Sequence, residues 1–305
     1  MRGASKRSLI IALSLITGFM IVEVVGSIIS GSLALLADAG HMLTDSAAIA
    51  LALFAMWLSG RSATVGRTFG YHRTEVLAAL VNTLSLWLIA GLIFFEAVER
   101  FFETPELEGG ILFTVGIIGL IVNIVAAYIL HAAAGESLNV EGAYQHVLAD
   151  MLGSVGVIIS GALVLAFEWY IADPILSIVV GLLILKSSWG LFMGVFKVLL
   201  EGTPDSVDMY ELCSEMEEVE GVTLVHDVHA WTITSGYNAF TAHVLVDPSY
   251  TGESDDLLNQ LRKIARRYDL THITLQLEHS AADCEQENHH VDHLVARSMA
   301  EADSM

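Results

Sequence analysis

The chain has 305 residues, of which 54% are hydrophobic and only 16% are charged, and its formal net charge is −21. Soluble domains carry about 25% charged residues, so this composition excludes an ordinary soluble globular protein and a disordered one. The strongly acidic net charge excludes a nucleic-acid-binding protein. The chain contains two cysteines, which excludes a disulfide framework.

The acidic charge is concentrated in the last third of the chain. Residues 1–200 contain 14 acidic and 9 basic side chains, whereas residues 201–305 contain 21 acidic and 5 basic ones. The long apolar segments all lie before residue 200. We therefore expect a membrane domain over residues 1–200, a soluble domain over residues 201–280, and a polar tail rich in His and acidic residues over residues 281–305.

Six apolar segments are long enough to cross a bilayer, because a hydrocarbon core about 30 Å thick requires roughly 20 helical residues. They are Leu9–Ile29, Ala34–Leu58, Val76–Val98, Ile111–Leu130, Ala143–Phe167 and Pro174–Val195. The first segment follows Arg2, Lys6 and Arg7, as in a signal peptide. It lacks a small-residue cleavage site, and a second segment follows directly, so we interpret it as an uncleaved helix.

Basic residues lie mainly on one side of the predicted bundle. They precede the first segment, separate the second from the third, and follow the sixth: Arg2, Lys6, Arg7, Arg61, Arg67, Arg73 and Lys197. The loops of the opposite side contain mainly acidic residues, with Arg100 as the one nearby base. By the positive-inside rule, both termini are expected to be cytoplasmic.

From about residue 201 the pattern becomes that of a soluble domain. Helices are predicted over Met209–Val219 and Asp255–Tyr268. Strands are predicted over Val222–Thr232, Ala239–Val246 and Thr271–Leu277. The order α-β-β-α-β predicts a small two-layer α+β domain.

Two of the predicted membrane segments carry a histidine and an aspartate four residues apart. The second segment contains His41 and Asp45, and the fifth contains His146 and Asp150. Residues at positions i and i+4 lie on one face of a helix, one above the other. Each helix therefore offers one imidazole and one carboxylate to the same side.

These two pairs are expected to meet, since the second and fifth segments run in opposite directions. Side-by-side packing brings His41 level with Asp150, and Asp45 level with His146. The four side chains then supply two nitrogen and two oxygen ligands around one point. Such a donor set suits Zn²⁺, with Co²⁺ and Cd²⁺ as alternatives.

An ionisable side chain inside a bilayer is costly, at about 3 kcal/mol or more for an aspartate. No Lys or Arg lies within one helical turn of Asp45 or Asp150 to offset that cost. The alternative explanation is a pair of His–Asp hydrogen bonds that only hold the helices together. Two matched pairs on separate segments favour a metal site over this structural role.

Histidines also cluster in the soluble part of the chain. Eight of the twelve lie after residue 201, several of them in the predicted strands, and Glu278 ends the last strand. A His-rich composition is a signal of metal binding. We therefore expect a second metal site in residues 201–280. Cys284, near His289 and His290 in the tail, is a weaker candidate ligand, and Cys213 is expected to be a buried thiol.

Several long stretches carry a resemblance to a known family: Gly31–Asp45, Thr68–Ala79, His146–Asp150, Leu200–Pro204 and His226–Trp231. On these residues the chain resembles the cation diffusion facilitators, in particular their zinc/cobalt/cadmium efflux branch. The resemblance covers nearly the whole chain. It implies a homodimer in a lipid bilayer, with six transmembrane helices per protomer and a cytoplasmic ferredoxin-like domain.

The resemblance also implies which residues bind metal. The family's ligands fall on His41, Asp45, His146 and Asp150 in the membrane, and on His226, His243, His272 and Glu278 in the cytoplasmic domain. Many relatives carry a long His-rich loop between the fourth and fifth segments. Here residues 132–139 form only a short connection, so metal delivery by such a loop is not expected.

We expect efflux of a divalent metal cation, Zn²⁺ above all, in exchange for protons. Ligands bind metal only when deprotonated, so metal and protons compete for them. Histidine has an unperturbed pKa near 6.5, which makes His41 and His146 natural proton carriers. Metal in the cytoplasmic domain is expected to be regulatory. Catalysis is not expected, and a bacterial or archaeal source would place the protein in the inner membrane.

Three alternative functions have to be weighed against this expectation. A proton-independent channel or an uptake carrier for divalent metals, including one that prefers Co²⁺, Cd²⁺ or Mn²⁺, would use the same residues. An intramembrane metalloenzyme needs an open coordination position, which four protein ligands do not leave, and the sequence has no His-Glu-x-x-His motif. A sensor that is only anchored by its helices would not require metal ligands inside the membrane.

Overall fold

The structure is a computed structural model that describes residues 2–30, 33–102, 109–135, 137–167 and 169–279. Side chains at some positions within these ranges, residues 33–41 among them, lie outside the description. The chain divides into two compact units, Met1–Phe196 and Lys197–Met305. The predicted tail, residues 281–305, falls outside the described residues. Each unit is described by itself.

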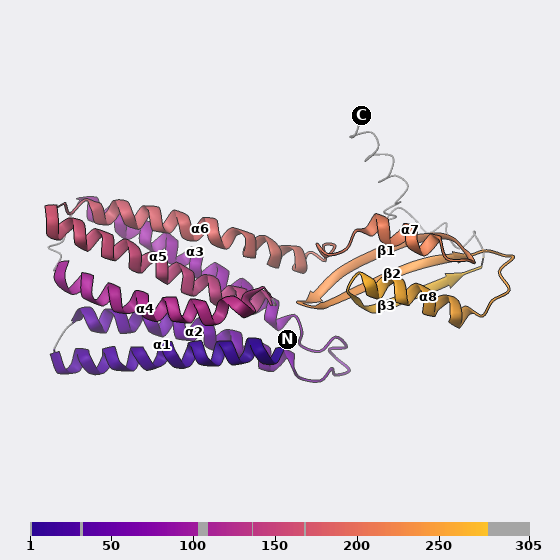
Figure 1. Ribbon diagram of the computed structural model, residues 1–305, viewed down its shortest axis with the longest axis horizontal. Helices are drawn as coiled ribbons and strands as arrows, with labels where there is room; N and C mark the ends of the chain where they lie inside the picture. Colours follow the sequence, from indigo (N-terminus) through magenta and orange to yellow (C-terminus); the bar gives the residue numbers. More distant parts are fainter. Residues whose placement is uncertain (1, 31–32, 103–108, 136, 168, 280–305) are drawn as a thin grey trace, which may run out of the picture. The chain divides into compact units, whose positions relative to one another are not determined.

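The first unit is built from six long helices that lie side by side (Figure 1). They are α1 (Arg2–Ser30), α2 (Leu33–Ser59), α3 (Thr74–Phe102), α4 (Gly109–Ala134), α5 (Leu138–Phe167) and α6 (Ala172–Leu199). Each of the six predicted segments corresponds to one of these helices. Within the described residues, the stretches long and apolar enough to cross a membrane are Thr74–Phe102, Ile117–Ala134, Leu138–Phe167 and Pro174–Leu199.

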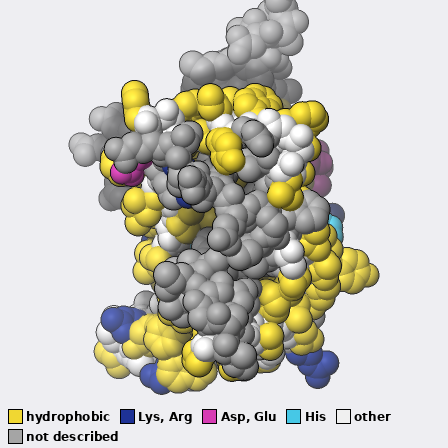
Figure 2. Space-filling view, turned by 90° about the vertical axis from the view of Figure 1, so that its left-hand side faces the viewer, with side chains coloured by type: hydrophobic (Ala, Val, Ile, Leu, Met, Phe, Trp, Pro, Cys, Tyr) yellow, Lys and Arg dark blue, Asp and Glu magenta, His cyan; other side chains and the backbone are white. Residues whose placement is uncertain are grey.

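The surface of this unit is apolar in the way expected of a membrane domain. Large hydrophobic side chains point outward on several helices; Leu88 is 65% exposed, Phe95 72% and Tyr128 82%. Figure 2 shows hydrophobic side chains over much of the described surface in that view. Because such side chains are stable only against lipid or protein, the arrangement indicates a bundle that crosses a bilayer.

Small residues let the helices of the bundle approach closely. α4 packs against α5 and α1, and α2 packs against α1, α3 and α5. Ala12, Ala52, Ala126 and Ala143 are completely buried in the core that α1, α2, α4 and α5 share. Lipid provides no hydrophobic force between helices, so close contact of small residues is a main source of their association.

A polar contact fixes α6 to α3. The indole Nε1 of Trp87 donates a hydrogen bond to the Ser188 hydroxyl at 2.9 Å. The rings of Trp87 and Trp189 are stacked, with their centroids 5.7 Å apart. This side of the bundle is therefore held by aromatic packing in addition to small residues such as Ala90.

The second unit has the predicted order of elements. It contains α7 (Met209–Glu217), β1 (Val222–Thr234), β2 (Tyr237–Val246), α8 (Ser254–Arg267) and β3 (Leu270–Glu278). β1 pairs with β2 antiparallel, and β2 pairs with β3 parallel. Both strands of the hairpin extend further than predicted, because Gly236 adopts a φ of 71° and closes a tight turn after Thr234.

Both helices of this unit share a core with one face of the sheet (Figure 1). Leu212 and Met216 of α7 and Leu257 and Leu261 of α8 are completely buried, as is Phe240 of β2. Side chains alternate between the faces of a strand, so the residues between these core positions point to the other face of the sheet. That other face carries the histidines of the strands.

Cys213 is a core thiol, as predicted. Burial raises the pKa of the Cys213 thiol from its ordinary value of 9.0 to about 12, and the nearby Glu217 carboxylate adds to the increase. The thiolate is the reactive and metal-binding form of cysteine, so this side chain is unsuited to either role.

We expect the Cys213 thiol to resist alkylation in the folded protein. In a Cys284→Ser variant, iodoacetamide at pH 9 should label Cys213 about a hundredfold more slowly than in the unfolded chain, as followed by mass spectrometry. The folded state keeps a proton that the unfolded chain releases, so the free energy of unfolding should fall as pH rises from 9 to 12. Equal labelling rates for the folded and unfolded chains would contradict this.

Candidate metal centres

Three ionisable side chains meet in the interior of the membrane unit. Asp45 of α2 and His146 of α5 are each 2% exposed, and Asp150 of α5 is 8% exposed. One ligand atom of each lies within 4.8 Å of those of the other two. The Nε2 atom of His146 lies 3.2 Å from the Oδ1 atom of Asp45. The structure thus brings together three of the four residues predicted for this site.

A second contact between α2 and α5 defines how the two helices are aligned. The side-chain Nδ2 of Asn139 donates a hydrogen bond to the backbone carbonyl of Ala52 at 2.8 Å. Asn139 precedes His146 by seven residues and Ala52 follows Asp45 by seven, so both contacts fit one antiparallel register. That register places position 41 of α2 level with Asp150. The side chain of His41 itself lies outside the described residues.

The donor set of this group suits a borderline divalent metal. It provides one imidazole nitrogen and two carboxylates in a region from which water is almost excluded. Two carboxylates at this separation repel each other unless a cation or a proton lies between them. A divalent ion would neutralise both charges, which removes the main cost of burying them.

A second group of ligands lies on the exposed face of the sheet. The Nε2 atom of His226 is 3.0 Å from one carboxylate oxygen of Glu278, and the Nδ1 atom of His243 is 2.8 Å from the other. His226 and His243 are opposite each other in the β1–β2 register. One ligand atom of each of the three residues lies within 4.8 Å of the other two. Glu278 is only 4% exposed, so its charge requires a partner.

A fourth ionisable group, which sequence reasoning missed, completes this cluster. Asp227 has a φ of 50°, in the left-handed region, where β1 is irregular between His226 and His229. Its carboxylate lies 3.1 Å from the Nε2 atom of His229 and 3.6 Å from the Nε2 atom of His243. A ligating histidine commonly directs its second ring nitrogen to a carboxylate, which orients the imidazole. Asp227 lies on that side of His243, at an ion-pair distance, while its hydrogen bond is made with His229.

The structure does not bring His272 to this cluster within one chain. His272 is opposite Ala239 in the β2–β3 register, whereas Gln276 is opposite His243. Four residues along a strand correspond to about 13 Å. His272 lies instead near the ring of Tyr237, with a centroid separation of 6.3 Å. Cys284, His289 and His290 fall outside the described residues.

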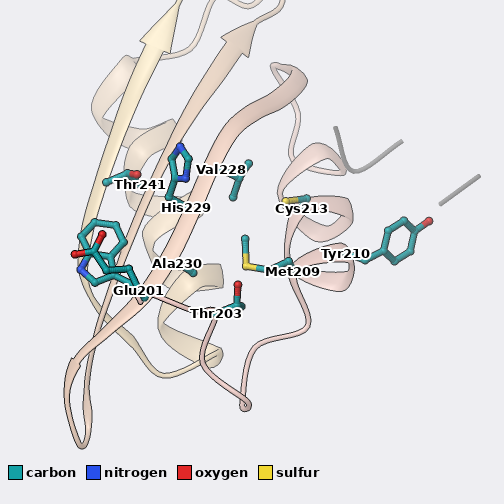
Figure 3. Close-up of a pocket in the computed structure, with 10 residues that line it drawn as sticks. Glu201, Thr203, Met209, Tyr210, Cys213, Val228, His229, Ala230 and Thr241 are labelled. Atoms are coloured by element: carbon teal, nitrogen blue, oxygen red, sulfur yellow. The ribbon is translucent and has the colours of Figure 1, made fainter. Parts of the chain in front are cut away.

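The same unit has a cavity of about 460 Å³, lined in part by Met209, Cys213, Val228 and Ala230 (Figure 3). Its lining is mainly apolar, and the raised pKa of Cys213 keeps that thiol protonated. Figure 3 shows the Tyr210 ring pointing away from these residues. Glu201 and His229 also line the cavity, but among the described residues the groups of ligand atoms that converge are those around Glu278 and Asp45.

Two family models match the chain, one over each of its two compact units. Residues 9–200 match the family model of the cation efflux transmembrane domain, and residues 204–280 match that of the cytoplasmic domain of cation efflux proteins. The chain belongs to the cation efflux family. The predicted resemblance is thereby confirmed, together with the fold of a helical membrane domain followed by a small α+β domain.

Relatives in the cation efflux family align over most of this chain. The cadmium, cobalt and zinc/H(+)-K(+) antiporter of Bacillus subtilis is 42% identical over 92% of this chain and 91% of its own length. The zinc transporter ZitB of Escherichia coli is 45% identical over 90% of this chain and 88% of its own length. The metal cation efflux system protein CzcD of Cupriavidus metallidurans is 42% identical over 93% and 89%, respectively.

The geometry around His243 predicts that Asp227→Asn weakens zinc binding in the cytoplasmic unit about tenfold, because a neutral amide orients the imidazole less strongly than a carboxylate. Zinc would be titrated calorimetrically in full-length protein that also carries Asp45→Asn and Asp150→Asn, so that the membrane site is silent. Asp269→Asn is the matched control, since Asp269 also has a positive φ, 58°, in the same unit. Equal zinc affinities for the two variants would contradict the orienting role.

Proposed function

We propose that this protein exports divalent metal cations, Zn²⁺ first among them, in exchange for protons. The observation that carries the proposal is the buried group of Asp45, His146 and Asp150, which joins α2 to α5 in the interior of the membrane unit. His41, level with Asp150 in the helix register, is the fourth ligand of the proposed site. Two imidazoles and two carboxylates in a tetrahedral arrangement are a suitable coordination for zinc.

The choice of cation follows from the donor atoms. Nitrogen together with carboxylate oxygen favours Zn²⁺, Co²⁺ and Cd²⁺ over Mg²⁺ and Ca²⁺, which prefer sites made of oxygen alone. The name of the Bacillus subtilis relative refers to the same three metals, and that of the Escherichia coli relative refers to zinc. We therefore propose that the chain carries zinc and accepts cobalt and cadmium at lower affinity.

Proton coupling follows from the chemistry of the ligands. Each imidazole and carboxylate binds metal only after it has lost its proton, so loading with metal releases protons and protonation releases metal. The three described ligands are almost completely buried, so an ion can enter or leave only when the helices move. Movement that opens the site to one side at a time couples the two fluxes.

The cytoplasmic cluster is proposed to regulate transport. A metal ion held by His226, His243 and Glu278 would link all three strands, since each ligand comes from a different one. The family model of this domain supports a homodimer. His272 lies on the same face of the sheet as Glu278, and its role as a ligand stays a prediction.

The basic residues of the membrane unit support the orientation. Arg61, Arg67 and Arg73 lie between α2 and α3, and Lys197 lies at the end of α6. The proposal places these ends of the helices, together with both termini, in the cytoplasm. It places the protein in a cell membrane, where cytoplasmic metal reaches the site and leaves to the outside.

Transport would be measured in liposomes that contain a zinc-sensitive dye and a pH-sensitive dye. We expect an imposed pH gradient to drive zinc in the direction opposite to the protons. Asp45→Asn and Asp150→Asn should each lower the zinc flux at least a hundredfold, because each keeps the size of the side chain and removes a charged ligand. Glu99→Gln, which removes an exposed carboxylate of α3, is the matched control and should transport normally.

The outcomes of this experiment separate the proposed antiporter from the other functions. Zinc flux that is indifferent to the pH gradient would show a channel. Zinc that moves together with the protons would show an uptake carrier. Transport of manganese or cobalt without zinc would leave the mechanism in place and overturn the proposed metal. Full activity of both aspartate variants would contradict the proposed site.

Competition between metal and protons also predicts a pH dependence of binding. The zinc affinity of the membrane site should fall about tenfold for each pH unit between 7 and 5 for every proton that metal displaces. The measurement is a calorimetric zinc titration of the full chain carrying His226→Ala and His243→Ala, so that binding reports on the membrane unit. An affinity that is constant over this range would contradict proton antiport at the site.

A further inference from the structure

Asn139 places a polar amide in the interior of the membrane unit. It lies in the first turn of α5 and is completely buried. Its Nδ2 donates to the backbone carbonyl of Ala52, and a carbonyl can only accept, so the amide nitrogen has to face α2. The Oδ1 atom therefore points away from α2. Among the described residues, that oxygen has no hydrogen-bond partner.

Packing alone does not explain an asparagine at this position. A buried carbonyl oxygen without a donor is destabilising, and a leucine of similar size would fill the space without that cost. A single hydrogen bond between membrane helices contributes only modestly to stability. The side chain is therefore better explained by the direction of its hydrogen bond than by its contribution to the fold.

The surfaces of α2 and α5 need such a directional contact. Where they approach, the buried side chains are apolar: Ala52 and Ile49 of α2 pack in one core with Val140, Ala143 and Val147 of α5. Apolar contacts are non-directional, whereas a satisfied buried hydrogen bond specifies one arrangement of the helices. A slip of one residue displaces a helix by about 1.5 Å and turns it by about 100°. That would carry His146 away from Asp45.

We propose that Asn139 is a positioning residue for the metal site, which sets the register of α5 on α2. Its hydrogen bond lies two helical turns, about 10.5 Å, from the contact between Asp45 and His146. The two contacts agree on one register, and this register brings both His–Asp pairs level. Because an amide does not titrate, the hydrogen bond between Asn139 and Ala52 persists while the ligands exchange metal for protons. This inference rests on the proposed function.

The test compares metal binding with stability in the full-length protein. Asn139→Leu removes both the donor and the unpartnered oxygen. Asn139→Asp keeps the shape and cannot donate to Ala52 when its carboxyl group is ionised, so binding is measured at about pH 8. The zinc affinity of the membrane site should fall tenfold to a hundredfold in both variants. The thermal midpoint without metal should be unchanged or higher in Asn139→Leu, because an unpartnered polar atom has been removed.

Ser188→Ala provides the matched control. Ser188 is completely buried in α6, and its hydroxyl accepts the hydrogen bond of the Trp87 Nε1 of α3 at 2.9 Å, so the variant removes a contact between helices that does not involve α5. Zinc affinity should therefore stay within about twofold of the parent protein. All variants would carry His226→Ala and His243→Ala, so that calorimetry reports on the membrane site alone.

The outcomes distinguish the positioning role from the proposed function. If Asp45→Asn and Asp150→Asn leave zinc binding intact, the proposed site fails, whatever Asn139 does. If they abolish binding but Asn139→Leu and Asn139→Asp bind zinc as tightly as the parent, the positioning role is overturned. An Asn139→Leu variant that loses thermal stability and zinc affinity together, while Asn139→Asp keeps both, would show a packing role only.

Discussion

Two carboxylates are buried in the membrane domain, and the free-energy cost of burying them constrains the structure around them. Asp45 and Asp150 lie where water is nearly excluded, and an uncompensated charge there would unfold or displace the helices. A divalent cation or protons compensate the two charges equally well in principle. The same pair of carboxylates would therefore account both for the metal binding proposed at this site and for its proposed link to protons.

The arrangement of the helices around the site allows one cation to reach both carboxylates. α2 and α5 run in opposite directions, and each carries a histidine and an aspartate four residues apart, which are the proposed ligands. Apolar residues pack between the two helices, and the proposed role of Asn139 is to set their register through its hydrogen bond to Ala52. In the cytoplasmic unit, the left-handed backbone of Asp227 turns its carboxylate toward His229 of the same strand and His243 of the neighbouring strand.

Much of the fold and of the candidate metal site could be predicted from the sequence, and the features that could not be predicted have physical reasons. The spacing of His41, Asp45, His146 and Asp150 predicted the meeting of α2 and α5, because helical periodicity fixes which residues share a face. His272 was expected as a ligand from the family resemblance alone. The β2–β3 register, which no local pattern encodes, places it opposite Ala239 rather than opposite His243, and its role as a ligand stays a prediction. The irregular pairing of β1 at Asp227 and the hydrogen bond from Asn139 to Ala52 both depend on tertiary contacts, so they were not predicted.

The most direct test of the account is the coordination of zinc in the membrane unit, measured by X-ray absorption on full-length protein carrying His226→Ala and His243→Ala. The account predicts four nitrogen or oxygen neighbours at about 2.0 Å, with the scattering pattern of two imidazoles, and loss of the bound zinc in Asp150→Asn. Six oxygen neighbours, a sulfur neighbour, or an unchanged spectrum in Asp150→Asn would contradict a site made of His41, Asp45, His146 and Asp150.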